Sequence, residues 1–161
     1  MKSIFAACTI FAASAVQAQA HVTAEPHEAA AGATQEVRFR IGHGCHDTAA
    51  TTALRVEMPA GLASARPQPK PGWALAITRR PDGTVSAITW TGNLPGDQFD
   101  DFAVLVRLPA TEGQIYFPAV QTCGGEAERW TDIPAAGAAA PSHPAPWLRL
   151  GPAAPDSGHH H

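Results

Sequence analysis

The sequence contains few charged residues and no cluster of basic ones. Eleven Lys and Arg stand against fourteen Asp and Glu in 161 residues, and the formal net charge at pH 7 is -3. Nucleic-acid binding depends on clustered Lys and Arg that displace counterions from phosphate. Because no such cluster is present, the composition argues against a nucleic-acid partner.

Apolar residues repeated at helical spacing are also missing. The fifteen prolines and fourteen glycines instead indicate many turns and few long helices. Alternating apolar residues predict short strands at residues 37–41, 54–58, 75–77, 88–90, 102–108, 115–117 and 129–133. The pattern favours an all-β fold, an antiparallel two-sheet sandwich of about seven strands, with a small barrel as the alternative.

Only the first twenty residues hold a long apolar run. Lys2 precedes the run Ile4–Val16, and Ala18-Gln19-Ala20 follows with the small-x-small pattern of a cleavage site. This arrangement predicts a signal peptide at residues 1–20, cut between Ala20 and His21. No second run is long enough to span a bilayer, so we expect a periplasmic or secreted protein with no membrane span after cleavage.

The remaining chain divides into a domain and a tail. Residues 21–134 carry the predicted strands and form the expected β-sandwich. Residues 135–161 are rich in Ala and Pro, and we expect a loosely ordered tail that docks partly through the segment around Trp147. His159–His161 end this tail and by themselves indicate no function.

The cysteines lack a CxxC spacing. Cleavage would remove Cys8 and leave Cys45 and Cys123 as a pair in an oxidising compartment, which predicts one disulfide. A shared metal site and two unrelated thiols are the alternatives. His43 and His46 flank Cys45 in a Gly-rich turn, and they are either a second metal site or ordinary loop residues.

His21 would gain a second nitrogen donor on cleavage. Its freed α-amino group and its imidazole Nδ1 can bind one metal ion in a six-membered chelate ring. Such nitrogen donors favour late first-row ions, with Cu(II) at the top of the affinity order. Both nitrogens must lose their protons first, so binding should weaken on acidification. The alternative is that a histidine follows the cleavage site by coincidence of composition.

Several motifs resemble one known family, the YcnI-like copper-binding domain, catalogued as a domain of unknown function. They occur in the family's order over nearly the whole predicted mature chain: His21–Pro26, Glu28–Gly32, Thr51–Pro59, Pro71-Gly72-Trp73, Ile88–Gly92, Phe117–Thr122, Arg129-Trp130 and His143–Pro146. The resemblance implies an immunoglobulin-like β-sandwich. It also implies Cu(II) bound at a single-histidine brace, meaning the N-terminal amine and imidazole of one histidine plus a glutamate, with a tryptophan close by.

Carried over to this sequence, the resemblance places the brace on His21, the glutamate on Glu57 and the tryptophan on Trp130. Glu57 alternates with apolar strand residues and should leave the core face, which is also true of an ordinary solvated residue. Glu25 and Glu28 are alternative oxygen ligands. Neutral indole offers only an N–H donor, so Trp130 would shield the ion, bond a water or carboxylate, or simply pack in the core.

The motifs lead to an exported copper(II)-binding protein that acts in copper acquisition, storage or delivery. A periplasmic copper chaperone or a membrane copper transporter would be its partner. The alternative is a copper-dependent oxidase or oxygenase, in which His143 or His46 supplies a further nitrogen ligand. A structural sandwich without metal is the third hypothesis. No Ser/His/Asp spacing or phosphate-binding loop suggests other chemistry.

Overall fold

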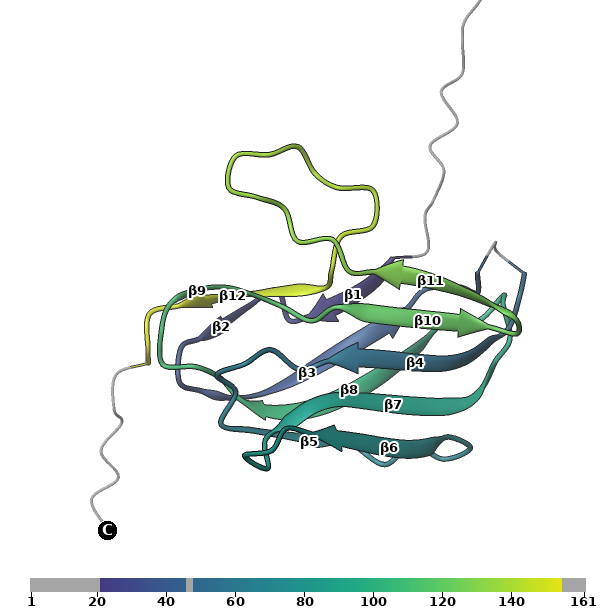
Figure 1. Cartoon of the computed structure of the whole chain (residues 1–161), viewed down its shortest axis with the longest axis horizontal. Coiled ribbons are helices and arrows are strands. Elements are labelled where there is room, and N and C mark those ends of the chain that lie inside the picture. The colour runs from purple at the N-terminus through teal and green to yellow at the C-terminus, as the bar shows by residue number, and fades with distance from the viewer. Residues whose placement is uncertain (1–20, 46–47, 155–161) are drawn as a thin grey trace, which may run out of the picture.

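The computed structural model describes residues 21–45 and 48–154. Within these ranges the chain forms twelve strands and no helix, arranged in three sheets (Figure 1). No helix of the described part is long and apolar enough to cross a membrane. The predicted signal peptide with Ala20, the loop residue His46 and the terminal histidines His159–His161 lie outside the described residues.

Two antiparallel sheets make up the body of the sandwich. The first has the strand order β1-β3-β8-β5 and comprises β1 (Val22–Glu25), β3 (Thr34–Ile41), β8 (Asp100–Arg107) and β5 (Ser64–Pro67). The second has the order β11-β10-β4-β7-β6 and comprises β11 (Glu126–Trp130), β10 (Ala119–Cys123), β4 (Thr51–Glu57), β7 (Val85–Leu94) and β6 (Ala74–Arg79).

A third, smaller sheet extends the sandwich at one end. Its order is β2-β12-β9, and its strands are β2 (Glu28–Ala30), β12 (Trp147–Gly151) and β9 (Gly113–Tyr116). β12 pairs parallel with β2 and antiparallel with β9. The chain therefore passes from the first sheet to the third between β1 and β2, where the Glu25–Pro26 peptide bond is cis.

The core lies between the two larger sheets and follows the alternation seen in the sequence. In β3, Val37, Phe39 and Ile41 are fully buried, whereas the arginines between them reach toward solvent. Side chains alternate across a strand, so one face of each sheet is apolar and packs on the other sheet. The largest fully buried side chains are Trp90, Trp130, Phe39, Phe102 and Phe117.

The predicted all-β sandwich is confirmed, and strands occur at each predicted segment. The structure adds β1, β2, β5, β10 and β12, which the alternation did not reveal. β12 lies within residues 135–161, which we assigned to a partly docked tail. Its Leu148 and Leu150 are buried, so residues 147–151 are part of the folded domain.

The predicted disulfide between Cys45 and Cys123 is present. It joins the loop after β3 to the last residue of β10, and both cysteines are buried. The backbone amide of Cys45 also donates to Cys123 Sγ at 3.1 Å. The bond therefore links the two larger sheets at the end of the sandwich where β4 begins.

Replacing both cysteines by alanine should lower the free energy of unfolding by about 2–4 kcal/mol, because the unfolded chain regains the freedom of the loop that the disulfide closes. Urea unfolding of the variant and of the oxidised wild type measures this difference. The wild type unfolded in the presence of a reductant is the control and should match the variant. Equal midpoints for the variant and the oxidised wild type would contradict a stabilising role.

An ion-pair network lies on the outward face of β1, β3 and β8. Arg40 donates from Nε and from a terminal nitrogen to the two carboxylate oxygens of Asp101, each at 2.8 Å, and it also contacts Glu25 Oε1 at 3.4 Å. The hydrogen bonds from Arg40 and its positive charge hold the pKa of Asp101 below its usual range. The paired carboxylate thus favours the folded state while it is ionised.

The variant Asp101→Asn should therefore be less stable than the wild type near neutral pH, by at most about 1 kcal/mol because the pair is partly solvated. A lowered carboxyl pKa stabilises the fold above the unfolded-state value of about 3.9, and this contribution disappears as the pH falls through the folded-state pKa. Urea unfolding midpoints of the variant and the wild type measure the stability difference, which should be present near neutral pH and absent at a pH below the titration of the carboxyl group. Asp97→Asn, at an exposed turn residue, is the matched control and should show no such pH-dependent difference.

Candidate metal centre

The candidate site lies at one open side of the sandwich. β1 is the edge strand of the first sheet and β11 is the edge strand of the second, and the two edges lie on the same side of the molecule (Figure 1). His21 immediately precedes β1, and Trp130 is the last residue of β11. Their rings are in contact, with centroids 5.0 Å apart and planes inclined by 58°. The structure thus brings together two of the three residues predicted for the site.

Trp130 belongs to the core as well as to the edge. It lies opposite Ala119, which in turn lies opposite Val56, and all three side chains are buried. The indole is only 1% exposed, and its Nε1–H has no acceptor among the described residues. A buried N–H without a partner is uncommon in native proteins and calls for an explanation at this position.

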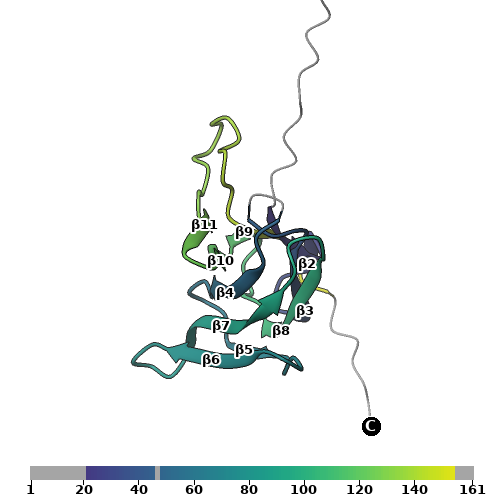
Figure 2. The ribbon, with the colours of Figure 1, turned by 90° about the vertical axis from the view of Figure 1, so that its right-hand side faces the viewer.

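A second histidine contacts the same indole. The ring centroids of Trp130 and His143 are 5.3 Å apart, and their planes are inclined by 37°. His143 lies at the end of a long excursion between β11 and β12, which rises from the sandwich in both ribbon views (Figure 2). The sequence analysis considered His143 only as an optional nitrogen ligand, because the motif His143–Pro146 by itself does not reveal its spatial partner.

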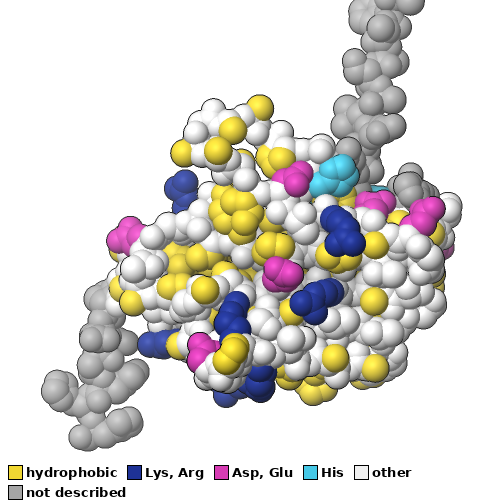
Figure 3. All heavy atoms as spheres, in the orientation of Figure 1, with side chains coloured by type: hydrophobic (Ala, Val, Ile, Leu, Met, Phe, Trp, Pro, Cys, Tyr) yellow, Lys and Arg dark blue, Asp and Glu magenta, His cyan; other side chains and the backbone are white. Residues whose placement is uncertain are grey.

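The two histidine rings are accessible, although the indole that both of them contact is not. His21 and His143 are both exposed, and Figure 3 shows histidine side chains at the surface close to where the described chain begins, beside acidic and basic side chains. A hollow of about 180 Å³ lies next to His21. It is lined by His21, Val22, Thr23, Ala24, His27, Pro144, Ala145, Pro146 and Trp147.

Glu57, the predicted oxygen ligand, lies at the end of β4 and is exposed. Its backbone amide donates to the carbonyl of Pro118 at 2.8 Å. The preceding residue, Val56, faces the core in the same cross-strand row as Trp130, so the alternation of the strand turns Glu57 to the outward face. β10 lies between β4 and β11. The register therefore does not place Glu57 on the face that carries Trp130.

The other carboxylates that could serve as the oxygen ligand differ in whether they already form ion pairs. Glu25, an alternative in the sequence analysis, forms ion pairs with Arg38 and Arg40. Glu28, the second alternative, is exposed in β2. Asp132, which the sequence analysis did not single out, is exposed and lies two residues after Trp130. Because Asp132 forms a bridge with Pro144, which lines the hollow beside His21, it is a further oxygen donor to test.

The alternative of a metal site that uses the Cys45 thiolate in the Gly-rich loop does not apply. Cys45 is engaged in the disulfide. His43 is half-buried, and its Nδ1 lies 2.9 Å from the carbonyl oxygen of Gly44. Its own carbonyl accepts a hydrogen bond from the buried Gln121 side chain. These contacts tie the described part of this loop to the fold, whereas His46 lies outside the described residues.

The donor set at the edge is compatible with copper. Among residues 21–45 and 48–154, no three His, Cys, Asp or Glu side chains are grouped closely enough to hold a metal ion. A histidine brace does not need such a group, because one residue supplies both the amine and the imidazole. His21 Nδ1 and the amine that the predicted cleavage would release are nitrogen donors that suit Cu(II). The indole of Trp130 contacts the His21 ring, and its N–H has no acceptor among the described residues.

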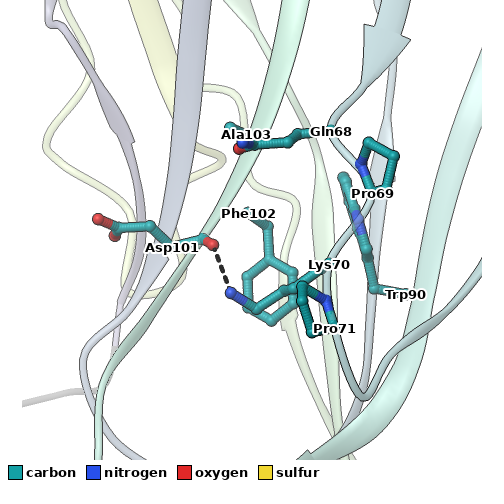
Figure 4. A pocket seen from close by; sticks show the side chains of 8 residues that line it. All are labelled: Gln68, Pro69, Lys70, Pro71, Trp90, Asp101, Phe102 and Ala103. Atoms are coloured by element: carbon teal, nitrogen blue, oxygen red, sulfur yellow. Dashed lines mark hydrogen bonds between the residues drawn. The ribbon is translucent and has the colours of Figure 1, made fainter.

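A second hollow, of about 170 Å³, contains none of the predicted ligands. In Figure 4 the side chain of Lys70 lies against Phe102, and its Nζ donates to the backbone carbonyl of Asp101 at 3.1 Å. The same Nζ lies 2.6 Å from the carboxylate of Asp100. The charge of Lys70 is therefore already compensated. The hollow lies where the Gln68–Pro71 segment packs against β7 and β8.

The two packed sheets define the chain as an immunoglobulin-like β-sandwich. A solved structure of an uncharacterised protein from Nocardia farcinica, described as having an immunoglobulin-like fold, is similar with a TM-score of 0.69 and 40% sequence identity. The similarity covers 81% of this chain and 97% of that chain. No curated protein matches this chain.

The chain belongs to the family described as "Domain of unknown function (DUF1775)", which is the YcnI-like family. The match covers residues 21–150. It therefore begins at His21 and includes Trp130, His143 and β12. The family recognised from the sequence motifs is thus confirmed.

Proposed function

We propose that this chain is an exported protein that is cut after Ala20 and binds Cu(II) through the amine and imidazole of His21. The observation that carries the proposal is the ring contact between His21 and the buried Trp130, whose indole N–H has no acceptor among the described residues. The contact holds the predicted chelating residue at a defined place on the sandwich edge. The family match, which starts at His21, supports the same cleavage position.

The export part of the proposal has separate support. The disulfide between Cys45 and Cys123 is typical of proteins in oxidising compartments. A periplasmic or secreted location would place the protein where copper enters or leaves the cell envelope. Copper acquisition, storage or delivery is the role that we propose, with a periplasmic copper chaperone or a membrane copper transporter as the partner.

In the proposed complex, His21 supplies both nitrogens of the chelate and a carboxylate supplies oxygen. Trp130 packs against the ring of His21 and thereby orients it. Copper, when bound, would supply a Lewis acid and a one-electron redox centre. A carboxylate ligand would favour Cu(II) over Cu(I), which suits a binding or delivery protein.

The first test is the intact mass of the secreted protein, followed by titration of Cu(II) into the mature chain. Serines at positions 159–161 remove the terminal histidines as competing ligands. We expect a mass that starts at His21 and binding of one Cu(II) per chain. A different N-terminus, or the absence of Cu(II) binding by the chain that starts at His21, would contradict the proposal.

The oxygen ligand is decided by paired variants. Glu57→Gln and Asp132→Asn each remove one negative charge and leave the size of the side chain unchanged. The variant that lacks the oxygen ligand should bind Cu(II) at least about 10-fold more weakly than the wild type, by analogy with the cost of losing an outer-shell partner. The other variant is the matched control.

The alternative function, a copper-dependent oxidase or oxygenase, is favoured by one observation. His143 contacts Trp130 and is a possible third nitrogen donor. Ascorbate as reductant and O₂ as oxidant should then give turnover with release of peroxide. Stoichiometric Cu(II) binding without peroxide supports the binding protein, whereas sustained peroxide release supports the enzyme.

A further inference from the structure

Strand β6 forms an open edge of the second sheet. It pairs with β7 on one side, and its other side pairs with no strand among the described residues. In Figure 1 and in Figure 2 it is the outermost strand of its sheet, on the side opposite β11. All six of its residues are exposed. Alternate backbone N–H and C=O groups along this edge are therefore available to a further strand.

Two large apolar side chains of β6 face inward without being covered. Leu75 lies opposite Trp90 of β7, and Ile77 lies opposite a second β7 residue, Ile88. Both β7 side chains are buried, and directly opposite residues share a face of the sheet, so Leu75 and Ile77 lie on the core face. They are nevertheless 39% and 41% exposed. The facing sheet ends at β5, which approaches β7, so the apolar side chains of β6 extend past the core.

This edge lacks the charges and prolines with which open edges usually repel a second strand. The segment Ala74–Thr78 contains neither. Arg79 follows at a register shift and donates to the carbonyl of Gly83 in its own hairpin. Arg80 donates to the carbonyl of Met58. Both arginines are thus bound within their own chain, and five successive residues of the edge are uncharged.

We infer that β6 pairs antiparallel with β6 of a second copy of this chain, about a two-fold axis at Ala76. In such a pairing each inward residue must oppose an inward residue of the other copy. With Ala76 opposite itself, Leu75 of each copy lies opposite Ile77 of the other. Ala74 then lies opposite Thr78. The exposed Leu and Ile side chains of the two copies cover one another, and every residue of the uncharged segment is paired.

The chemistry of the edge selects a second copy as the occupant. A charged strand would leave its charges without partners against β6, so the matching edge must be uncharged and apolar on its inward face. β6 is itself such an edge. Moving the axis to Ile77 would place Arg79 opposite Leu75, whereas the axis at Ala76 keeps charge out of the uncharged segment. β6 and β11 are opposite edges of one sheet, so the candidate metal site stays free in both copies. The inference goes beyond the proposed function and does not depend on it.

Sedimentation equilibrium of the chain that starts at His21, with serines at positions 159–161 and EDTA to exclude metal bridges, tests the inference. We expect a dimer that dissociates on dilution, because one added strand pair makes a small interface. Ala76→Lys and Ala76→Glu each place like charges directly opposite at the axis, and each should weaken the dimer at least about 10-fold. An equimolar mixture of the two variants should restore it, because Lys then lies opposite Glu. Thr91→Lys is the matched control, since this exposed residue lies on the outward face of β7, one strand inside the edge, and should leave the dimer unchanged.

A second readout uses a small substitution that keeps the fold. In Ala76→Cys the two introduced thiols meet at the axis, within the Cα separation that a disulfide spans. Oxidised glutathione should therefore link the two chains in Ala76→Cys and not in Thr91→Cys. A wild type that stays monomeric up to its solubility limit overturns the inference. A dimer that persists in both charged variants, or an Ala76→Cys chain that does not cross-link, also overturns it. A mixture no more associated than its two components overturns the axis at Ala76.

Discussion

Adding the dipeptide Ala-Pro ahead of His21 is expected to weaken Cu(II) binding about 10²–10⁴-fold, the gain that linking two donors in one molecule typically gives. The extension converts the His21 amine into a peptide nitrogen and leaves the imidazole in place. Proline has no amide N–H, so it blocks the chelate that an extended N-terminus forms through successive amide nitrogens. Calorimetric or competition titration of the two chains measures the difference.

Two controls make this result specific to the amine. The variant His21→Ala keeps a free amine but loses the imidazole, and it should lose affinity to a similar extent. Circular dichroism of the extended chain should be unchanged, because His21 is exposed and precedes the first strand. If the extended chain binds Cu(II) as tightly as the mature chain, the amine is not a ligand and the histidine brace is excluded.

The sequence predicted the sheets well where inward positions hold large apolar residues. In β3 the buried residues are Val, Phe and Ile in strict alternation. In β8 the large buried residues, Phe and Val, alternate as well, although the small Ala103 between them is also buried. Both strands were located within a few residues. β10 escaped notice for a physical reason. Its inward side chains are Ala119, Gln121 and Cys123, which are small or polar. A polar residue at a core position removes the period-two signal on which such predictions depend.

The buried Gln121 also shows what the sequence could not reveal about the loop near the disulfide. Its side-chain nitrogen donates to Thr51 Oγ1 at 2.8 Å and to the carbonyl of His43 at 3.0 Å. These two hydrogen bonds offset the cost of burying the side-chain nitrogen, whereas Oε1 has no partner among the described residues. Through the nitrogen the residue ties β4, β10 and the loop after β3 together. The partners are about seventy residues away in sequence, and their pairing depends on sheet register.

The site was predicted in part. His21 was predicted from the cleavage site as well as from the family motifs, Trp130 only from the family motifs, and the structure places their rings in contact. The contact of His143 with Trp130 was not foreseen, because it depends on a sixteen-residue connection between β11 and β12 that returns to Asp132. Glu57 matched the strand alternation, but alternation specifies only a face of the sheet. Which residues of another sheet lie near that face is set by packing and not by the local pattern.

Replacing Trp130 by alanine should destabilise the fold by about 3–5 kcal/mol, because it removes a large buried ring and leaves a cavity between β11 and the core. Trp130 packs in the same buried cluster as Val56. Ala119 lies opposite Trp130 on the paired strand β10. Urea unfolding followed by far-ultraviolet circular dichroism measures the loss without relying on tryptophan fluorescence. Trp147→Ala, at a 37% exposed site, is the matched control and should cost much less.

The same variant tests whether Trp130 serves the metal or only the core. The amine and imidazole of His21 remain in Trp130→Ala, so Cu(II) binding should persist, although the ring contact that orders His21 is lost. Trp130→Phe keeps an aromatic ring but removes the indole N–H, which has no acceptor in the described part of the chain. Equal Cu(II) affinity in Trp130→Phe and the wild type would assign Trp130 to packing. Weaker binding in a stably folded Trp130→Phe would instead show that the indole N–H interacts with the bound complex, through a copper-bound water or the carboxylate ligand.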